Sequence, residues 1–266
     1  MTDPLKNPVE LFDIAGKSAL VVGAAGALGS VAAVSLGAAG AKMTLASGNK
    51  TDLEAVAREV RNAGGEAQTV NLRPETVEDA ETMVAAATKA YGRLDLVFVA
   101  SGMNKNAMIT DARVADFQAI MDANVLGSWL VCRAAGKQLI TQGTGGKIVL
   151  VSSTRGKLGH PGGYTSYCTS KSATDGLVRA LGCEWGKHGI TVNAIGPTVF
   201  RSNLTAWMFE AEDPGKSVRE GMLARIPLGR LGEPNDLVGV ILFLLSPASD
   251  FCTGQTLYVD GGYTAG

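Results

Sequence analysis

The segment Ser18-Ala-Leu-Val-Val-Gly-Ala-Ala-Gly-Ala-Leu-Gly29 decides the fold. Its apolar first half predicts a buried β-strand, and the small residues that follow predict a tight turn into a helix ending near Gly40. Gly23, Gly26 and Gly29 would let the backbone turn sharply and present helix N-terminal N–H groups to a bound phosphate. Close packing of a helix against a strand uses the same small residues, so the turn alone fits both interpretations.

The alternation of strand and helix continues along the whole chain. Further strands are predicted at Met43–Ala46, Ala67–Leu72, Leu94–Ala100, Lys147–Val151, Ile190–Ile195 and Thr256–Val259. Helices are predicted at 51–62 (opened by a Thr51/Glu54 capping box), 76–91, about 112–142, 165–185 and 236–245. Because no linker or repeat interrupts the series, residues 1–266 are predicted to form a single α/β domain, a parallel sheet covered by helices on both faces.

Composition excludes several classes of function. The 24 basic and 25 acidic residues give a net charge of −1, which predicts no binding to nucleic acid and no attraction to an anionic membrane. The uncharged stretch between Lys17 and Lys42 is long enough to span a bilayer, but it consists mostly of Gly, Ala and Ser. We therefore expect neither a membrane span nor a signal peptide. The four cysteines and two histidines lack zinc-ligand spacing, so we expect no metal site, reduced thiols and a cytoplasmic location.

Three polar features fall where a parallel sheet binds its ligands. Tyr167 and Lys171 lie four residues apart on a predicted helix, so the phenol and the ammonium share a face. Ser153 ends the preceding strand, at the carboxyl edge of the sheet. Asn124 interrupts an apolar helix, and a buried Asn needs a specific partner. An isolated Tyr-x-x-x-Lys is more often two ordinary surface residues, so the combination carries the argument.

Taken together, these segments resemble the short-chain dehydrogenase/reductase family, in its shorter single-domain branch, over nearly the whole length. The matching segments are the turn at 23–29, Asn124–Gly127, Ser152-Ser153, Tyr167 with Lys171, Asn193–Pro197, Pro227–Arg230 and Val259–Gly262. The resemblance implies a doubly wound Rossmann-type sheet of about seven strands and a nicotinamide cofactor. It also implies hydride transfer between that cofactor and an alcohol or ketone carbon.

The resemblance also assigns roles to individual residues. Tyr167 would be the general acid in ketone reduction and the base in alcohol oxidation, and Lys171 would lower its pKa and bind the nicotinamide ribose. Ser153 would hydrogen-bond the substrate oxygen, and Asn124 would hold a proton relay beyond Lys171. The residues that would contact the cofactor are Gly23, Ala25, Gly26, Leu28, Gly29, Ser47, Gly48, Asn49, Asn71, Leu72, Ala100, Gly102, Tyr167, Lys171, Pro197, Phe200 and Ser202.

The chain departs from the family pattern at several positions. Val22 replaces the usual Thr, Ala27 replaces a Gly, and Asn71 replaces an Asp. Further departures are Val99-Ala100-Ser101-Gly102 for Asn-Asn-Ala-Gly, Pro197-Thr198 for Pro-Gly, and Ser202 for Thr. The Gly23-x-x-Gly26-x-x-Gly29 spacing fits the longer epimerase/dehydratase branch, which stays an alternative. The short chain and its terminal Val-Asp-Gly-Gly favour the dehydrogenase interpretation.

The end of the second strand bears on the choice of cofactor. An acidic residue there would bind the adenosine ribose and reject a 2′-phosphate. The sequence has Ser47-Gly48-Asn49-Lys50 instead, and Asp52 is explained as first-turn helix chemistry. Small polar residues and Lys50 would accept a phosphate, although this segment has no Arg to clamp one. The segment favours NADP(H) over NAD(H).

The substrate is predicted only by class. Arg155 and His160 lie in the loop between Ser153 and Tyr167, where they would bind an anionic group and a hydroxyl, or else be solvated loop residues. The segment 202–222 resembles the family's substrate lid. We expect a small polar substrate, first a sugar acid or polyol and second an aliphatic or cyclic ketone. By resemblance we also expect a homotetramer formed through the helices at 112–142 and 165–185.

Two functions of other classes stay open at this stage. A noncatalytic nucleotide-binding regulator on the same fold would keep the glycine turn without needing Ser153, Tyr167 and Lys171 together. A methyltransferase would share the strand, turn and helix at the start but would have no use for the Tyr–Lys pair. A change in nicotinamide absorbance with alcohols and ketones separates both from a dehydrogenase.

Overall fold

Seven parallel strands form one sheet in the order β3-β2-β1-β4-β5-β6-β7. A computed structural model describes residues 4–202 and 205–266. The strands are β1 Ser18–Val22, β2 Lys42–Ala46, β3 Glu66–Val70, β4 Leu96–Val99, β5 Gly146–Val151, β6 Ile190–Pro197 and β7 Thr256–Val259. The strand order reverses between β1 and β4, which is where ligands of such sheets bind. The predicted doubly wound sheet is confirmed.

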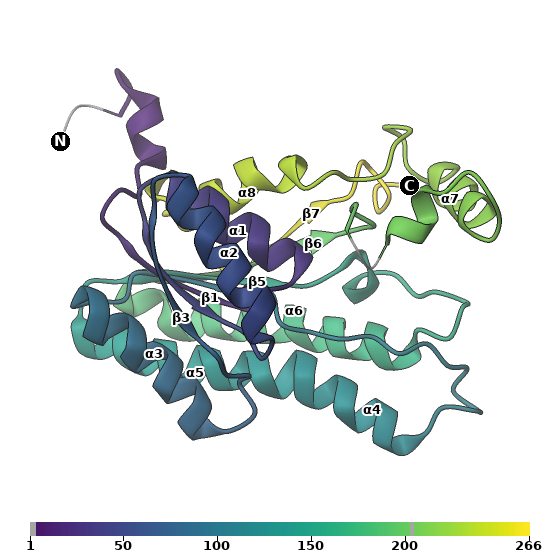
Figure 1. The fold of residues 1–266 in the computed structure, drawn as a ribbon, viewed down its shortest axis with the longest axis horizontal. Helices are drawn as coiled ribbons and strands as arrows, with labels where there is room; N and C mark the ends of the chain where they lie inside the picture. Colours follow the sequence, from purple (N-terminus) through teal and green to yellow (C-terminus); the bar gives the residue numbers. More distant parts are fainter. Residues whose placement is uncertain (1–3, 203–204) are drawn as a thin grey trace.

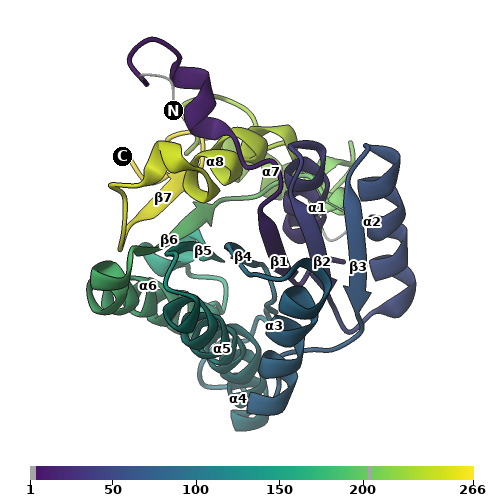
Figure 2. The same ribbon diagram turned by 90° about the vertical axis from the view of Figure 1, so that its left-hand side faces the viewer.

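Helices cover both faces of the sheet, as Figures 1 and 2 show. One layer contains α1 Ala27–Ala38, α2 Lys50–Asn62 and α8 Asn235–Leu245, and the other contains α3 Val77–Tyr91, α4 Val114–Met121, α5 Gly127–Gln142 and α6 Thr165–Trp185. The short helix α7 Gly215–Leu223 projects beyond these layers near the C-terminus (Figure 1). Among the helices of the described ranges, none is long and apolar enough to cross a membrane.

The central strand is buried on both faces, which explains its continuous apolar sequence. Ala19 and Val21 pack into the core on the side of α1 and α8, whereas Leu20 and Val22 pack into the core on the side of α3 and α5. Side chains alternate along a strand, so β1 contributes to both cores in turn. This places the turn after Val22 at the middle of the carboxyl edge.

Two local predictions are corrected. The N-cap of α2 is Asn49, whose side chain accepts a hydrogen bond from the Asp52 N–H at 3.2 Å, and not Thr51. The Glu54 carboxylate, expected to complete a capping box, instead accepts a bond from Thr69 Oγ1 at 2.6 Å. The helix predicted over 112–142 contains a turn of π-helix at Asp122–Leu126. Apolar spacing alone does not reveal such a turn, which often marks a functional position.

Candidate active site

The glycine turn after β1 is shaped by close backbone packing. Gly23 has φ of 80°, and a Cβ added there would lie 2.5 Å from the Ser101 nitrogen. A Cβ on Gly29 would overlap the Gly23 carbonyl oxygen. The N-cap residue of α1, Gly26, has no side chain to satisfy the first N–H groups of the helix. Such uncapped donors at a helix start are available to a bound phosphate.

A cleft of about 820 Å³ runs along the carboxyl ends of β1 to β4. Seven of the predicted cofactor residues line it: Gly23, Gly26, Ser47, Gly48, Leu72, Ala100 and Gly102. Its size and its small-residue walls fit a dinucleotide, with the uncapped start of α1 facing the phosphates. The cleft therefore favours the nicotinamide cofactor that the sequence predicted.

Other predicted cofactor residues have different neighbours. Asn49 caps α2, and the Asn71 amide donates to the Ser47 carbonyl oxygen at 2.8 Å. Ala25, Leu28, Gly29, Asn49 and Asn71 are not among the lining residues of the large cleft. Pro197 ends β6, and the Ser202 hydroxyl lies 3.0 Å from that of Thr205.

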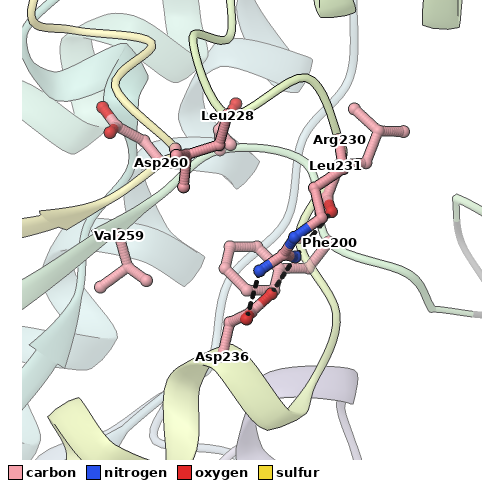
Figure 3. A pocket seen from close by; sticks show the side chains of 10 residues that line it. Phe200, Leu228, Arg230, Leu231, Asp236, Val259 and Asp260 are labelled. Atoms are coloured by element: carbon pink, nitrogen blue, oxygen red, sulfur yellow. Dashed lines mark hydrogen bonds and ion pairs between the residues drawn. The ribbon is translucent and has the colours of Figure 1, made fainter.

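Phe200 lines a second, smaller pocket of about 200 Å³ between the ends of β6 and β7 and the start of α8. Figure 3 shows Arg230 reaching to Asp236 across this pocket, with Nη1 to Oδ2 at 2.6 Å and Nη2 to Oδ1 at 2.8 Å. The ion pair satisfies both charged groups, so this pocket is a structural junction between the C-terminal segment and α8.

Arg73 is a cleft residue that the sequence reasoning missed. It follows β3 and lies across Gly48, where an added Cβ would overlap its Nε. Among the described residues, its guanidinium has no carboxylate in hydrogen-bond or ion-pair contact. The segment Ser47–Lys50 after β2 contains no Arg. Because β2 and β3 pair in parallel, with Ala46 beside Val70, the residues after each strand are neighbours, and that register is the signal that identifies Arg73.

Ser153, Tyr167 and Lys171 converge at the carboxyl end of β5. Ser153 follows this strand, while α6 supplies Tyr167 and Lys171. The Lys171 ammonium donates to the Val151 carbonyl oxygen at 2.8 Å and lies 5.6 Å from the centroid of the Tyr167 ring. A Cβ on Gly102, which lines the cleft, would be 3.7 Å from Lys171 Nζ. The Lys171 ammonium therefore lies next to Gly102, a residue of the cleft wall.

Asn124 is buried and clamps two segments together. Its Oδ1 accepts from the Met103 N–H at 2.7 Å, and its Nδ2 donates to Met103 O and to Ser170 Oγ, both at 2.9 Å. Ser170 donates in turn to the carbonyl oxygen of Tyr167 at 2.8 Å. The π-helical turn places Asn124 for these contacts. Ser170 is a second residue that sequence reasoning missed, since its role depends on tertiary contact.

Burial governs the ionisation of the pair. It raises the pKa of Tyr167, an effect that hydrogen bonding from Ser153 partly opposes. Burial also lowers the pKa of Lys171 to about 8, while Asp175 acts in the opposite direction. The sequence predicted that Lys171 lowers the pKa of Tyr167; in this structure Ser153 and Arg155 are the groups that lower this pKa, and burial outweighs them, so the phenol is protonated at neutral pH.

The predicted substrate residues lie beside this pair. Arg155 is buried, and His160 accepts a hydrogen bond from the Gly162 N–H at its Nδ1, at 3.0 Å. Burial and the cations Arg155 and Arg225 lower the pKa of His160, so its ring is neutral near pH 7.

The predicted lid contains a short 3₁₀ helix, Ala206–Phe209, followed by α7. Phe209 and Met222 of this segment pack against the buried cluster formed by Ile226, Leu231 and Tyr263. The Trp207 side chain is exposed to solvent. Residues 203–204, at the start of the predicted lid, lie outside the described residues.

Comparison with known proteins adds independent information. A family model described as enoyl-(acyl carrier protein) reductase matches residues 23–264. A protein named "uncharacterized oxidoreductase" from Mycobacterium tuberculosis is 56% identical over 255 residues, covering 96% of this chain and 93% of that protein. A short-chain type dehydrogenase/reductase from Mycobacterium marinum has a TM-score of 0.88 at 31% identity, covering 97% and 99% of the two chains. A gluconate 5-dehydrogenase from Burkholderia cenocepacia in complex with NADP and tartrate has a TM-score of 0.90 at 27% identity, covering 98% and 100%.

Proposed function

The chain belongs to the short-chain dehydrogenase/reductase family of NAD(P)-dependent oxidoreductases, and from this premise we propose that it interconverts a secondary alcohol and a ketone with Tyr167 as general acid and base. One observation carries the proposal. Gly102 lines the cleft that fits the dinucleotide, and the same glycine lies against Lys171 and Asn124. This proximity supports the proposal that the binding cleft and the acid–base pair act as one site.

The chemistry follows from the residues. A bound nicotinamide would supply the hydride in ketone reduction or accept it in alcohol oxidation. Tyr167 is protonated at neutral pH, and burial raises its pKa further, so it can donate a proton to the ketone oxygen as negative charge develops there. The Ser153 hydroxyl donates a second hydrogen bond to that oxygen. In the oxidation direction Tyr167 accepts the proton, so the rate of oxidation should rise with pH while the rate of reduction falls.

Lys171 and Asn124 make hydrogen bonds to the backbone segments around Tyr167. The bond from Lys171 Nζ to Val151 O fixes the ammonium next to Gly102 and the phenol ring. Asn124 holds the Met103 backbone and, through Ser170, the Tyr167 carbonyl oxygen. We propose that this network positions α6 and carries protons from the pair toward solvent.

We propose NADP(H) as the preferred cofactor, with Arg73 as the contact for its 2′-phosphate. Ser47 and Gly48 provide no carboxylate to repel a phosphate, and Arg73 lies directly over Gly48. A guanidinium pairs with a phosphate through two parallel hydrogen bonds. The relative from Burkholderia cenocepacia, which was crystallised with NADP, agrees with this preference.

Substitution of Arg73 tests the cofactor proposal by binding alone. We expect Arg73→Met to weaken NADPH binding by roughly 10- to 100-fold, the effect of losing one charge-assisted contact, and to leave NADH binding within about two-fold. Isothermal titration calorimetry with each dinucleotide measures both constants. The matched control is Arg58→Met, an exposed residue of α2 away from the cleft lining. Equal weakening for NADPH and NADH would contradict the assignment.

We propose a homotetramer assembled through α4, α5 and α6, and a cytoplasmic location. Exposed apolar side chains on α4, the π turn and α5 support association: Val114 is 83% exposed, and Phe117, Leu126, Trp129 and Ile140 are also exposed. The four cysteines are free thiols, which suits a reducing compartment.

The substrate class that the site supports is a small polar alcohol or ketone, a polyol or a sugar acid first. The gluconate 5-dehydrogenases among the relatives act on such a compound by their printed names. The test is the change in nicotinamide absorbance when the purified protein meets NADPH and a panel of ketones, or NADP and a panel of alcohols. Turnover of at least one secondary alcohol or ketone is expected. Tight dinucleotide binding with no turnover across the panel would favour the noncatalytic regulator.

A further inference from the structure

We infer that the substrate carries a carboxylate and that Arg155 binds it beside the reacting carbon. The inference rests on the proposed function and deepens it, because it separates acids from neutral polyols within that substrate class. It is argued from a buried cation that has no anionic partner. One dinucleotide cleft and one Tyr–Lys pair would be needed for any substrate of this class, whereas Arg155 is needed only for an anion.

Arg155 is only 9% exposed, yet its partners are all neutral. Nη1 donates to Gly159 O at 3.1 Å, and Nη2 donates to the Tyr263 hydroxyl at 3.0 Å. Among the described residues no carboxylate pairs with it. Arginines are seldom this buried without an anionic partner, because the charge loses its hydration. Five N–H donors belong to a guanidinium, and the two bonds leave three for a ligand. Three donors are enough for one bidentate carboxylate.

A second cation reinforces the positive potential. Arg225 Cζ lies 4.4 Å from the centroid of the Tyr263 ring, and Arg155 Cζ lies 5.4 Å from the same centroid. Tyr263 itself is 3% exposed. No side-chain hydrogen bond or ion pair joins Arg225 to a carboxylate in the described ranges. Two like charges against one buried ring repel each other, and an anion bound between them would relieve that repulsion.

The cation is one aromatic ring away from the catalytic tyrosine. The Tyr164 ring centroid lies 5.8 Å from Arg155 Cζ and 6.3 Å from the centroid of the Tyr167 ring. The backbone N–H of Arg155 donates to Ser153 Oγ at 3.2 Å, so the two residues share one tight turn. In agreement with this geometry, the charge of Arg155 lowers the pKa of Tyr167 against the larger effect of burial. A small acid with its carbonyl at Tyr167 and Ser153 would extend its carboxylate toward Arg155.

His160 packs beside Tyr164, on the same side of the site as Arg155. Its ring centroid is 4.5 Å from that of Tyr164, in edge-on contact. Because Nδ1 accepts the Gly162 N–H, the neutral ring carries its proton on Nε2 and can donate to a substrate hydroxyl. This side of the site therefore offers a cation for a carboxylate and a neutral donor for a hydroxyl, which is the pattern of a hydroxy acid.

A purely structural role makes a different prediction. The bonds to Gly159 O and Tyr263 Oη tie the 154–160 segment to the C-terminal segment, and a tether alone would be indifferent to substrate charge. The ratio of kcat/KM for an acid to kcat/KM for its methyl ester separates the two roles. Loss of a tether lowers both values together, whereas loss of an anion contact lowers only the value for the acid.

The experiment uses short-chain oxo acids and hydroxy acids, each paired with its methyl ester, with turnover followed by nicotinamide absorbance. For the wild-type protein we expect the acids to be preferred. In Arg155→Met the acid-to-ester ratio should fall by roughly 10- to 100-fold, the range for one lost charge-assisted hydrogen bond. In Arg155→Lys the acid-to-ester ratio should fall less, because lysine keeps the positive charge but lacks the paired N–H donors of the guanidinium. Arg225→Gln should lower the ratio mainly through KM.

Lys157→Met is the matched control, because it removes an exposed cation from the same loop. Its acid-to-ester ratio should stay within about two-fold of wild type, as expected for a screened surface charge. If Arg155→Met fails to fold, the acid-to-ester ratios of Arg155→Lys and Arg225→Gln test the same contact. Equal use of acids and esters by the wild type, or an unchanged ratio in the Arg155 variants, would overturn the inference while leaving the dehydrogenase function intact. No turnover of either series, nor of the neutral panel, would overturn the proposed function itself.

Discussion

At the scale of single residues, the site places ionisable groups where burial favours their neutral forms. Lys171 shows this most clearly, since burial lowers its pKa to about 8 although Nζ keeps a hydrogen bond to Val151 O. In the unfolded chain the same ammonium titrates near 10.5. The unfolded state therefore binds more protons between these two pH values, and stability rises with pH across that window.

Substitution of Lys171 tests this ionisation directly. At pH values below about 8 the wild-type protein bears the full cost of the buried ammonium, so Lys171→Met should gain stability relative to it by up to about 3 kcal/mol. The gain should shrink as pH rises toward about 10, while the loss of the Val151 contact applies at every pH. Urea unfolding of both proteins at several pH values measures the difference. A difference that does not change with pH would contradict the lowered pKa.

Single residues also mark what a sequence can and cannot reveal. Tyr167 and Lys171 are separated by one helical turn, so their shared face follows from spacing alone. Arg73 meets Gly48 only because β3 lies beside β2, and Ser170 meets Asn124 only because α6 packs against the π turn. Neither contact is local in sequence, so neither was predicted. The pKa of Tyr167 was predicted in the wrong direction because its burial could not be read from the sequence.

At the scale of elements, α1 shows how local preference yields to tertiary packing. Gly29 lies in the first turn of this helix, where Ala would ordinarily be the better helix former by about 1 kcal/mol. Its position against the Gly23 carbonyl oxygen leaves no room for a Cβ. The contact involves backbone on both sides, so it cannot be relieved by rotating a side chain.

Two glycine substitutions test that packing. Gly29→Ala should destabilise the protein by roughly 1–3 kcal/mol, as overpacking does, and should weaken dinucleotide binding because the phosphate turn must move. Gly239→Ala is the control, since Gly239 lies within α8 and a Cβ there meets nothing within 4 Å. That substitution should stabilise by up to about 1 kcal/mol. Thermal unfolding and dinucleotide titration of both variants provide the measurements; equal stability changes would count against the account of the turn.

Element boundaries followed the sequence only where apolar spacing was decisive. The helix at 165–185 was predicted with the bounds that the structure gives, because apolar residues recur along it. The π turn at Asp122–Leu126 and the cap at Asn49 were missed. Both depend on which hydrogen bonds the folded molecule makes. The same amino-acid sequence is compatible with several hydrogen-bond patterns.

At the scale of the whole molecule, the strand order joins the separate features into one site. The reversal between β1 and β4 brings the ends of β1, β2, β3 and β4 along one cleft, and Ser153 follows β5, the strand next to β4. The alternation of strands and helices was enough to predict a parallel sheet with two helical layers. The seven-stranded doubly wound form came from the family resemblance, because alternation alone does not specify an order.

The central claim is hydride transfer with Tyr167 as the proton donor, and isotope transfer measures it most directly. NADPH deuterated at the transferred position is mixed with the ketone and oxo acid panels, and the alcohols formed are analysed by mass spectrometry. We expect wild-type protein to place one deuterium on the carbinol carbon, and Tyr167→Phe to do so at least about 100-fold more slowly with unchanged NADPH affinity. Deuterium transfer by Tyr167→Phe at the wild-type rate would contradict the account.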